Sequence, residues 1–129
     1  MVNGTFDIIH RGHLMMLQHA KSLGDHLLVA IDTDRRVAKL KGKNRPINNQ
    51  NDRRYMLESL RCVNTVYLFD SEEDLIEIMK EYQPDVYVKG SDWKHDKNST
   101  AEQYCNKVIY YDRVGDYSTT NIIQRIADW

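Results

Sequence analysis

The sequence predicts a three-layer α/β fold of Rossmann type, in which helices cover both faces of a parallel sheet. Segments with the apolar pattern of strands alternate with segments of helical periodicity along the chain. Residues 27–31 form a continuous apolar run, which is typical of a strand covered on both faces. Such alternation forms parallel β-α-β units with right-handed crossovers. Ligands of these sheets bind outside the carboxyl ends of the strands.

The expected elements begin with a short first strand. Met1–Val2 opens it and Asn3-Gly4 breaks its apolar pattern, although strands usually have about five residues. Further strands are expected at residues 27–31, 65–69, 86–88 and 108–111, and helices at residues 12–23, 35–40, 52–60, 71–82 and 121–127. Residues suited to capping stand at the helix ends: Gly24, Thr33 or Asp34, Ser71 with Asp74, and Ser118 or Thr119.

Four segments should meet at the ligand-binding edge of this sheet, because each follows the carboxyl end of an expected strand: residues 4–13, 32–41, 90–93 and 113–120. A polar loop at residues 41–51 leads to the helix 52–60, in which Tyr55 or Met56, Leu57 and Leu60 are expected to face the core. The chain has 129 residues and no visible repeat or linker. We therefore expect a single domain over residues 1–129.

Composition excludes several classes of partner. The net charge of −1 gives no electrostatic reason to expect nucleic acid or an anionic membrane surface. No apolar run approaches the roughly 20 residues of a membrane span, and the N-terminus has no signal-peptide pattern. Cys62 and Cys105 lack CxxC spacing, so we expect buried thiols in a reducing compartment and neither a disulfide nor a zinc frame. The expected location is the cytoplasm.

The residues with the clearest chemistry lie between the first strand and the first helix, in Gly4-Thr5-Phe6-Asp7-Ile8-Ile9-His10-Arg11-Gly12-His13. A helix N-terminus offers free N–H groups and partial positive charge, which suit a phosphate. Two imidazoles at this place can donate hydrogen bonds to phosphoryl oxygens in a transition state. Gly12 permits a close approach of backbone or phosphate. The alternative is that His10 and His13 are surface residues of a capped helix.

Several motifs together resemble the cytidylyltransferase-like nucleotidyltransferases. GTFDIIHRGH is similar to their signature GxFDxxHxGH. The segment after their second strand resembles KLKGKNRPINNQNDRR. Their fourth strand and its turn resemble VYVKGSDW, and the start of their last helix resembles YSTTNIIQRI. The resemblance covers nearly the whole chain. It implies an HxGH-type nucleotidyltransferase in which His10, His13, Lys41 and Arg53 are catalytic.

The same resemblance implies a set of nucleotide contacts and acceptor contacts. Nucleotide contacts are expected from Gly4, Thr5, Phe6, Gly12, Gly90, Asp92, Arg113, Ser118, Thr119 and Thr120. Acceptor contacts are expected from Asp7, Asp32 and Arg61, with a turn-holding role as the alternative for Asp7. Trp93 either stacks near the base or packs in the fold. Hydroxyls and free N–H groups at the start of the last helix also suit a phosphate on physical grounds, although plain capping is the alternative for residues 118–120.

Each basic candidate also has a plainer interpretation. Every second residue from Lys39 to Lys43 is a lysine. These lysines form either a solvated loop or a clamp on the β- and γ-phosphates. Lys41 is preferred because it precedes Gly42, where the family motif has its lysine. Arg53 fits the family's helix arginine better than Arg54, and either can be a solvated helix residue. Arg61 and Arg113 are candidates for contacts with a phosphate or the substrate, and each can instead be a solvated surface residue.

The reaction expected from this site needs no nucleophilic side chain. The acceptor's own phosphate attacks the α-phosphorus of an NTP, and pyrophosphate leaves. Mg²⁺ is expected to arrive with the triphosphate, since no carboxylate cage for a metal is visible. The resemblance also implies a homodimer.

Two subfamilies compete for the substrates. KLKG, RPIN, VKG and STTNII resemble the adenylyltransferase domain of ADP-heptose synthases, which implies ATP and heptose 1-phosphate. The chain length and Gly90-Ser91-Asp92-Trp93 resemble glycerol-3-phosphate cytidylyltransferases, which implies CTP and glycerol 3-phosphate. The first interpretation has the longer matches. A non-catalytic nucleotide-binding module is the alternative of another class. A dinucleotide-dependent oxidoreductase is disfavoured because G-x-G-x-x-G is missing after the first strand.

Overall fold

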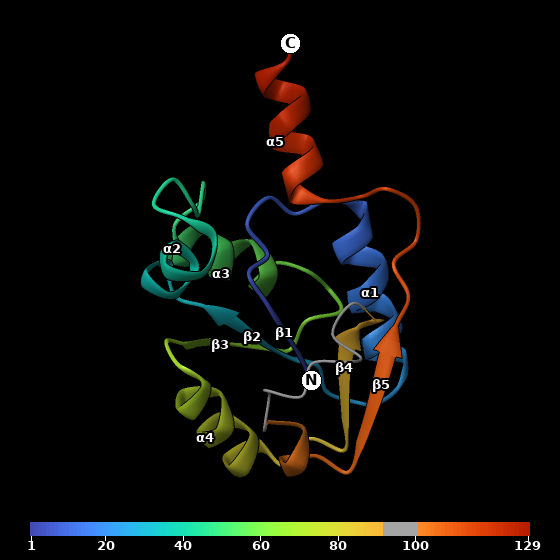
Figure 1. The fold of residues 1–129 in the computed structure, drawn as a ribbon. Coiled ribbons are helices and arrows are strands. Elements are labelled where there is room, and N and C mark those ends of the chain that lie inside the picture. The colour runs from blue at the N-terminus through green and yellow to red at the C-terminus, as the bar shows by residue number, and fades with distance from the viewer. Residues whose placement is uncertain (92–100) are drawn as a thin grey trace.

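A computed structural model describes residues 1–91 and 101–129 of the chain (Figure 1). Five parallel strands form one sheet in the order β3-β2-β1-β4-β5. They are β1 (Val2–Gly4), β2 (Leu28–Asp32), β3 (Thr65–Phe69), β4 (Val86–Gly90) and β5 (Lys107–Tyr111). The order reverses between β1 and β4, which is where a Rossmann-type sheet binds its ligand. The predicted fold class is confirmed.

Helices join the strands along the chain. They are α1 (Arg11–Ser22), α2 (Asp34–Lys41), α3 (Gln50–Glu58), α4 (Glu72–Tyr82), the 3₁₀ helix η2 (Ala101–Tyr104) and α5 (Thr119–Ala127). Thr33, Asn49, Ser71 and Ser118 cap α2, α3, α4 and α5 by accepting a backbone N–H near each N-terminus. Gly24 comes directly after Leu23, the C-cap residue of α1.

Two apolar cores lie on opposite faces of the sheet, because successive strand residues point to opposite faces. Val29 and Ile31 of β2 pack with residues of α1 and α3, including Leu17 and Leu57. Leu28 and Ala30 pack on the other face with residues of α4 and η2. These two cores make the three layers (Figure 1). Among the described residues, no helix is long and apolar enough to cross a membrane.

The first strand extends beyond its predicted break. β1 continues through Asn3 and Gly4, which stand opposite Ala30 and Ile31 in the register with β2. The side chain of Asn3 accepts a hydrogen bond from the Tyr87 hydroxyl, so its polarity is satisfied inside the sheet. A Cβ on Gly4 would lie 2.9 Å from Cε2 of Phe6. Contacts with Tyr87 and Phe6 allow Asn3 and Gly4 to lie in the strand. The apolar periodicity of the sequence does not reveal such contacts.

The helix α3 also differs from the prediction. It begins at Gln50, two residues earlier than expected, because the side chain of Asn49 caps it by accepting the Asp52 N–H at 2.9 Å. Tyr55 and Met56 are exposed, which contradicts their predicted inward orientation. The buried residues of α3 are Leu57 and Arg53. Apolar periodicity does not predict Arg53 as an inward-facing residue, because arginine is polar.

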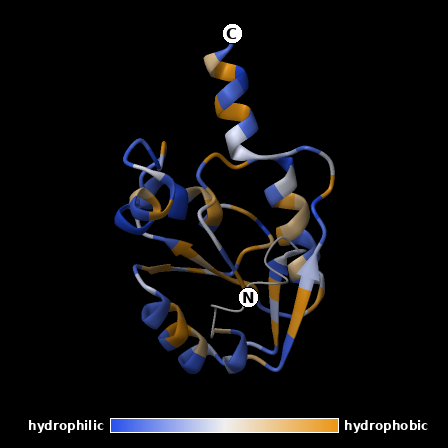
Figure 2. Cartoon of the chain, viewed as in Figure 1, coloured by the Kyte–Doolittle hydropathy of each residue, from blue (hydrophilic) through white to orange (hydrophobic). Residues whose placement is uncertain are grey.

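The last helix lies apart from both cores. α5 extends away from the sheet, and no residue in it is buried (Figure 1). Apolar and polar residues alternate along it in bands (Figure 2). Its apolar residues include Ile122, Ile123 and the exposed Ile126. Only the start of α5 approaches the carboxyl edge of the sheet.

Candidate functional site

A pocket of about 660 Å³ opens at the carboxyl ends of the strands, across the reversal point between β1 and β4. Each of the four segments predicted to meet there contributes to its lining. Thirteen of the predicted site residues line it: Gly4, Thr5, Phe6, His10, Gly12, His13, Asp32, Lys41, Gly90, Arg113, Ser118, Thr119 and Thr120. Asp92 and Trp93 lie outside the described residues.

The two histidines form a reciprocal pair at the N-terminus of α1. His10 is the N-cap residue, and its Nδ1 accepts the Gly12 N–H at 3.1 Å. The backbone N–H of His10 in turn donates to Nδ1 of His13 at 3.2 Å. The two rings are stacked, with centroids 3.8 Å apart. Because both Nδ1 atoms accept hydrogen bonds, each neutral ring carries its proton on Nε2 and can donate it.

Burial keeps this pair neutral near pH 7. Burial first, and then the neighbouring His10 and Lys41, lower the pKa of His13 to about 4. The pKa of His10 is also lowered, by burial first and then by the charge of Arg113. Two stacked imidazolium rings would repel one another at this distance. The two neutral rings are therefore suited to donating hydrogen bonds to an oxyanion while they keep their own protons.

Gly12 is required by the close approach of the loop before α5. A Cβ at this position would lie 2.8 Å from Cβ of Tyr117 and 3.0 Å from Cε1 of His10. The Thr119 hydroxyl, in the first turn of α5, donates to the Ile8 carbonyl at 3.2 Å. These contacts bring the N-termini of α1 and α5 to the same pocket. Two helix N-termini facing one cavity favour an anionic ligand.

Phe6 supports the pair from below the pocket. It is buried, with a positive φ of 52°, and its ring centroid is 5.0 Å from that of His13. A positive φ is uncommon for a bulky residue and marks a constrained position. The ring also fills the space that a Cβ on Gly4 would occupy. Phe6 therefore contributes to the orientation of His13 as well as to the pocket lining.

Lys41 is the last residue of α2 and lines the pocket, whereas Lys39 and Lys43 do not. Its pKa is lowered by burial first and then by the charge of Arg45. Asp32 lines the pocket nearby but already accepts hydrogen bonds from Arg36 Nε at 2.8 Å and from the Thr5 hydroxyl at 3.3 Å. Lys41 makes no ion pair with any carboxylate in the described part of the chain.

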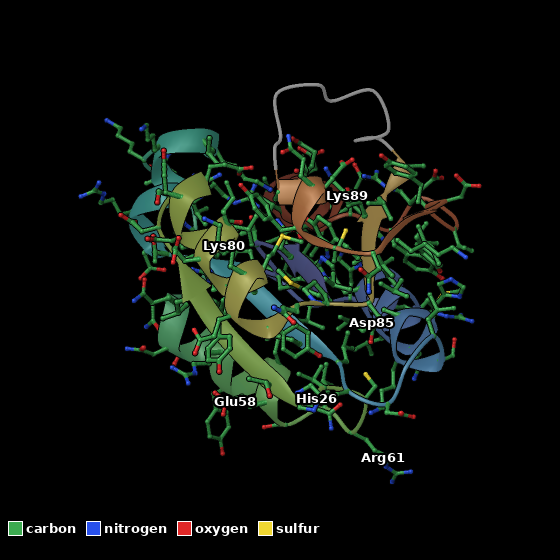
Figure 3. The ribbon with its side chains drawn as sticks, turned by 90° about the horizontal axis from the view of Figure 1, so that it is seen from below. His26, Glu58, Arg61, Lys80, Asp85 and Lys89 are labelled. Carbon is green, nitrogen blue, oxygen red and sulfur yellow. The ribbon has the colours of Figure 1, made fainter. Side chains whose placement is uncertain are left out.

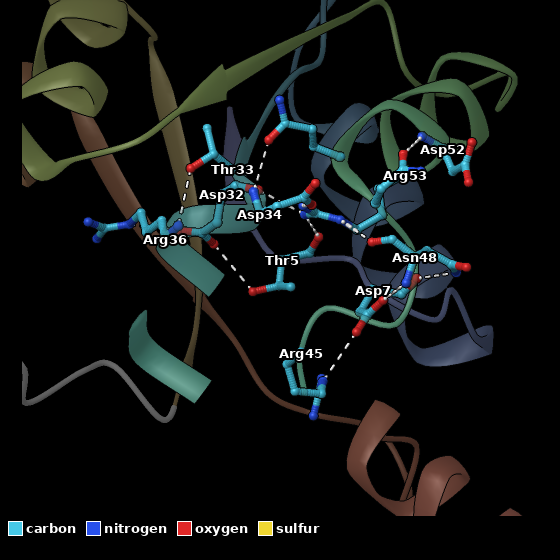
Figure 4. A network of polar contacts seen from close by, with 12 residues as sticks. Thr5, Asp7, Asp32, Thr33, Asp34, Arg36, Arg45, Asn48, Asp52 and Arg53 are labelled. Atoms are coloured by element: carbon cyan, nitrogen blue, oxygen red, sulfur yellow. Dashed lines mark hydrogen bonds and ion pairs between the residues drawn. The ribbon is translucent and has the colours of Figure 1, made fainter. Parts of the chain in front are cut away.

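Arg53 does not line the pocket, so the structure does not bring it together with His10, His13 and Lys41. The side chain is only 1 % exposed. Its Nη1 donates to the carbonyls of Thr5 and Asp32, both at 2.8 Å. The other nitrogens donate to the Asn48 carbonyl at 3.0 Å and to Asp34 Oδ1 at 2.9 Å (Figure 4). Arg53 is thus a positioning residue that joins the carboxyl ends of β1 and β2 to α3.

Asp7 holds the loop at residues 42–49 and makes no contact with the pocket. The residue is 2 % exposed, and its carboxylate accepts the N–H groups of Ile47 and Asn48, each at 2.8 Å. Nε of Arg45 donates to the same carboxylate at 3.2 Å (Figure 4). Asp7 is therefore not among the pocket residues, and the turn-holding alternative describes its place in the structure.

Arg61 lies at the opposite end of the sheet. It is exposed in the turn before β3, and parallel strands begin at the edge away from the pocket. Its side chain points away from the body beside the amino ends of the strands (Figure 3). The structure therefore does not bring Arg61 together with the other predicted site residues, because a position before a strand and one after it lie a strand length apart.

The pocket lining also includes residues that were not among the predicted contacts, and the basic and aromatic ones among them include Arg36, Arg45, Lys89 and Tyr117. Lys89 is buried near the end of β4, where its Nζ donates to Glu102 at 2.7 Å. Its place at the carboxyl end of a strand was a usable signal. Tyr117 precedes Ser118, so proximity to the capping residue was another signal. Arg36 lies in the predicted segment 32–41 and binds Asp32, four residues earlier. Arg45 is held at the pocket by Asp7, which is distant in the sequence.

The chain matches the family described as Cytidylyltransferase-like over residues 1–125. It belongs to the cytidylyltransferase-like family. A bifunctional protein HldE of Campylobacter fetus is 44 % identical over 96 % of this chain, and that of Helicobacter hepaticus is equally identical over the same share. The chain spans only about a quarter of the length of these two relatives (27 % and 25 %). Their similarity confirms the predicted resemblance within the cytidylyltransferase-like family.

A solved structure supports the same family assignment. The lipopolysaccharide core biosynthesis protein of Thermoplasma volcanium is 27 % identical, with a TM-score of 0.66. The similarity covers 92 % of this chain and 96 % of that one. Members of the cytidylyltransferase-like family are nucleotidyltransferases, and the pocket described above has the features that such a reaction needs. The histidine pair and residues at both helix N-termini line a single cavity.

Proposed function

We propose that this cytidylyltransferase-like protein transfers a nucleoside monophosphate from an NTP to a sugar phosphate or polyol phosphate, with release of pyrophosphate. The observation that carries the proposal is the reciprocal His10–His13 pair, which lines the pocket beside two helix N-termini and keeps both Nε2–H groups out of its own hydrogen bonds. Hydrogen-bond donors placed where negative charge develops account for much of the catalysis of phosphoryl transfer.

The chemistry proposed for this pocket is an in-line displacement. A phosphate oxygen of the acceptor forms a bond to the α-phosphorus, while the bond from that phosphorus to the bridging oxygen breaks. Pyrophosphate leaves with the electron pair. The Nε2–H groups of His10 and His13 stabilise the charge on the phosphoryl oxygens, and Lys41 binds the leaving phosphates. Positioning of the two substrates supplies the rest of the rate enhancement.

Mg²⁺ is the proposed companion of the NTP. Asp32 and Glu72 are the carboxylates among the described pocket residues, and Asp32 already binds Arg36. No group of three or more potential metal ligands occurs in residues 1–91 and 101–129. This donor set fits an ion held mainly by substrate phosphates and its own waters, which is the usual situation of Mg²⁺. When bound, Mg²⁺ would neutralise part of the phosphate charge.

ATP and heptose 1-phosphate are the substrates that we propose. The similarity to bifunctional HldE proteins and to a lipopolysaccharide core biosynthesis protein supports this pair. CTP and glycerol 3-phosphate form the second candidate pair, which the motif Gly90-Ser91-Asp92-Trp93 favours.

A panel of four NTPs against both acceptors, measured by pyrophosphate release, distinguishes these proposals. Turnover with ATP and heptose 1-phosphate is expected. Turnover restricted to CTP and glycerol 3-phosphate would replace the first proposal with the second. An absence of turnover with every pair would contradict the enzymatic proposal and support a non-catalytic binding module.

A homodimer is proposed for this chain. An isolated helix of fewer than about 12 residues is marginal in water, and α5 has nine residues, none of them buried. A second copy would cover its apolar residues Ile122, Ile123 and Ile126. Sedimentation equilibrium should give twice the chain mass of 15.2 kDa. A monomer at all concentrations would refute the proposal.

The cytoplasm is the proposed location. Cys62 and Cys105 are free thiols, as expected for a protein of a reducing compartment. Fractionation of cells that express a tagged chain should recover it with cytoplasmic markers, and recovery with envelope markers would contradict the proposal.

A further inference from the structure

The loop at residues 42–49 brings a second cation to the pocket beside Lys41. Arg45 lines the pocket, and its side chain is 16 % exposed. Its backbone N–H donates to the Gly42 carbonyl at 3.1 Å, so the loop turns sharply after α2. Gly42 has a φ of 106°, which a residue with a side chain rarely adopts. The turn returns the chain toward the pocket, which brings Arg45 to the side where α2 ends.

Asp7 orients the guanidinium of Arg45 through Nε and leaves Nη1 and Nη2 of the arginine unused. The carboxylate accepts three N–H groups, from Arg45 Nε and from the backbone of Ile47 and Asn48. Asn48 also donates from Nδ2 to the Asp7 carbonyl at 2.9 Å. Within residues 1–91 and 101–129, nothing accepts a hydrogen bond from Nη1 or Nη2 of Arg45. A guanidinium held at Nε keeps a planar pair of donors that matches a phosphate.

Arg45 and Lys41 are like charges at one side of the pocket. The charge of Arg45 is among the causes that lower the pKa of Lys41, so the two groups interact unfavourably. Neither carboxylate nearby offsets both charges, because Asp32 binds Arg36 and Asp7 binds the backbone of the loop as well as Arg45. A bound phosphate between the two cations would turn this repulsion into attraction.

We propose that Arg45 is a further phosphate-binding residue of the pocket, which receives a phosphate group together with Lys41 through Nη1 and Nη2. The phosphate belongs to the NTP or to the acceptor. Its assignment to a substrate rests on the proposed function, whereas the binding of a phosphate group does not. Asp7 is the positioning residue that orients this guanidinium.

Calorimetric titration with inorganic pyrophosphate tests the proposal directly. Arg45→Gln should raise the Kd for pyrophosphate about tenfold or more, because a charged bidentate contact is lost. Arg45→Lys should weaken binding less, since it keeps the charge and loses the fork. Arg54→Gln is the matched control: it removes the same charge from α3, where Arg54 pairs with Glu58 outside the pocket. Its Kd should stay within about twofold of the wild type.

A purely structural role for Arg45 would give a different result. In that case Arg45→Gln would lower the melting temperature and leave the Kd for pyrophosphate unchanged, which would overturn the proposal. If Arg45→Gln fails to fold, Arg45→Lys decides: weaker binding supports the proposal, and wild-type affinity overturns it.

Steady-state kinetics then identify the substrate that carries the phosphate. A rise in KM for the NTP alone assigns Arg45 to the triphosphate, and a rise for the acceptor alone assigns it to the acceptor phosphate. Unchanged KM values for both would contradict the proposal. Failure of every NTP–acceptor pair to react would contradict the proposed function only, because pyrophosphate binding requires no turnover.

Discussion

Substitution of His13 by asparagine separates the catalytic role of the ring from its structural role. The Oδ1 atom of asparagine occupies nearly the place of Nδ1, so it can still accept the His10 N–H that His13 accepts at 3.2 Å. Asparagine has no atom at the place of Nε2, so the donor to the phosphoryl oxygen is lost. The loss of one such donor lowers kcat by about 10²–10³-fold. Stability should change by less than about 1 kcal/mol, the net value of one hydrogen bond.

His13→Ala gives the comparison that makes this result informative. Alanine removes the acceptor as well, so the His10 N–H loses its partner at a cost of about 1–3 kcal/mol in the free energy of unfolding. Both variants should be equally slow in pyrophosphate release, but only alanine should unfold at clearly lower urea concentrations. His19→Asn, at an exposed position of the same helix, is the control and should keep wild-type turnover. Near-normal turnover of His13→Asn would refute the mechanism.

Three further predictions follow from contacts around the pocket. Arg53→Met should lower the free energy of unfolding by about 3 kcal/mol or more, because it leaves buried carbonyls unpaired; urea unfolding measures this, and a change under about 1 kcal/mol would contradict the positioning role. Gly12→Ala places a Cβ 2.8 Å from that of Tyr117, so turnover should fall about tenfold or more through a strain of 1–3 kcal/mol; unchanged kinetics would show that the close contact is unimportant. The pKa of His13 is about 4 in the folded chain and about 6.5 in the unfolded chain. Between these pH values only the unfolded chain has a protonated His13. The free energy of unfolding should therefore fall by up to about 3 kcal/mol as the pH drops from 6.5 towards 4. His13→Asn should lack that contribution, and identical pH profiles for both proteins would contradict the lowered pKa.

The pocket is the part of the molecule that the sequence predicted best, because its residues are local in the chain or follow strand ends. His10, Gly12 and His13 lie within one turn, so their hydrogen bonds depend on backbone geometry at a helix start. Ser118 begins a helix that the sequence marks by a cap and by apolar periodicity. Such features need no knowledge of distant contacts.

The predicted site residues that lie away from the pocket have side chains whose direction depends on distant segments. Arg53 and Arg61 are both arginines near the same helix, and no local signal says that one lies under the pocket and the other at the far edge. An acceptor contact is predicted for Asp7, which stands in the motif, yet its partners are residues 45–48. No local signal marks Arg45 as a pocket residue. Its function depends on Asp7, which is 38 residues away.

The sequence by itself determined the alternation of strands and helices, the edge at which the ligand binds, and the histidine pair at the N-terminus of α1. Those properties follow from periodicity, capping and the direction of parallel strands, all of which act over a few residues. Only the tertiary structure decided which charged side chains face the pocket and which are buried beneath it. That choice depends on which buried carbonyls and carboxylates need a donor once the strands and loops meet.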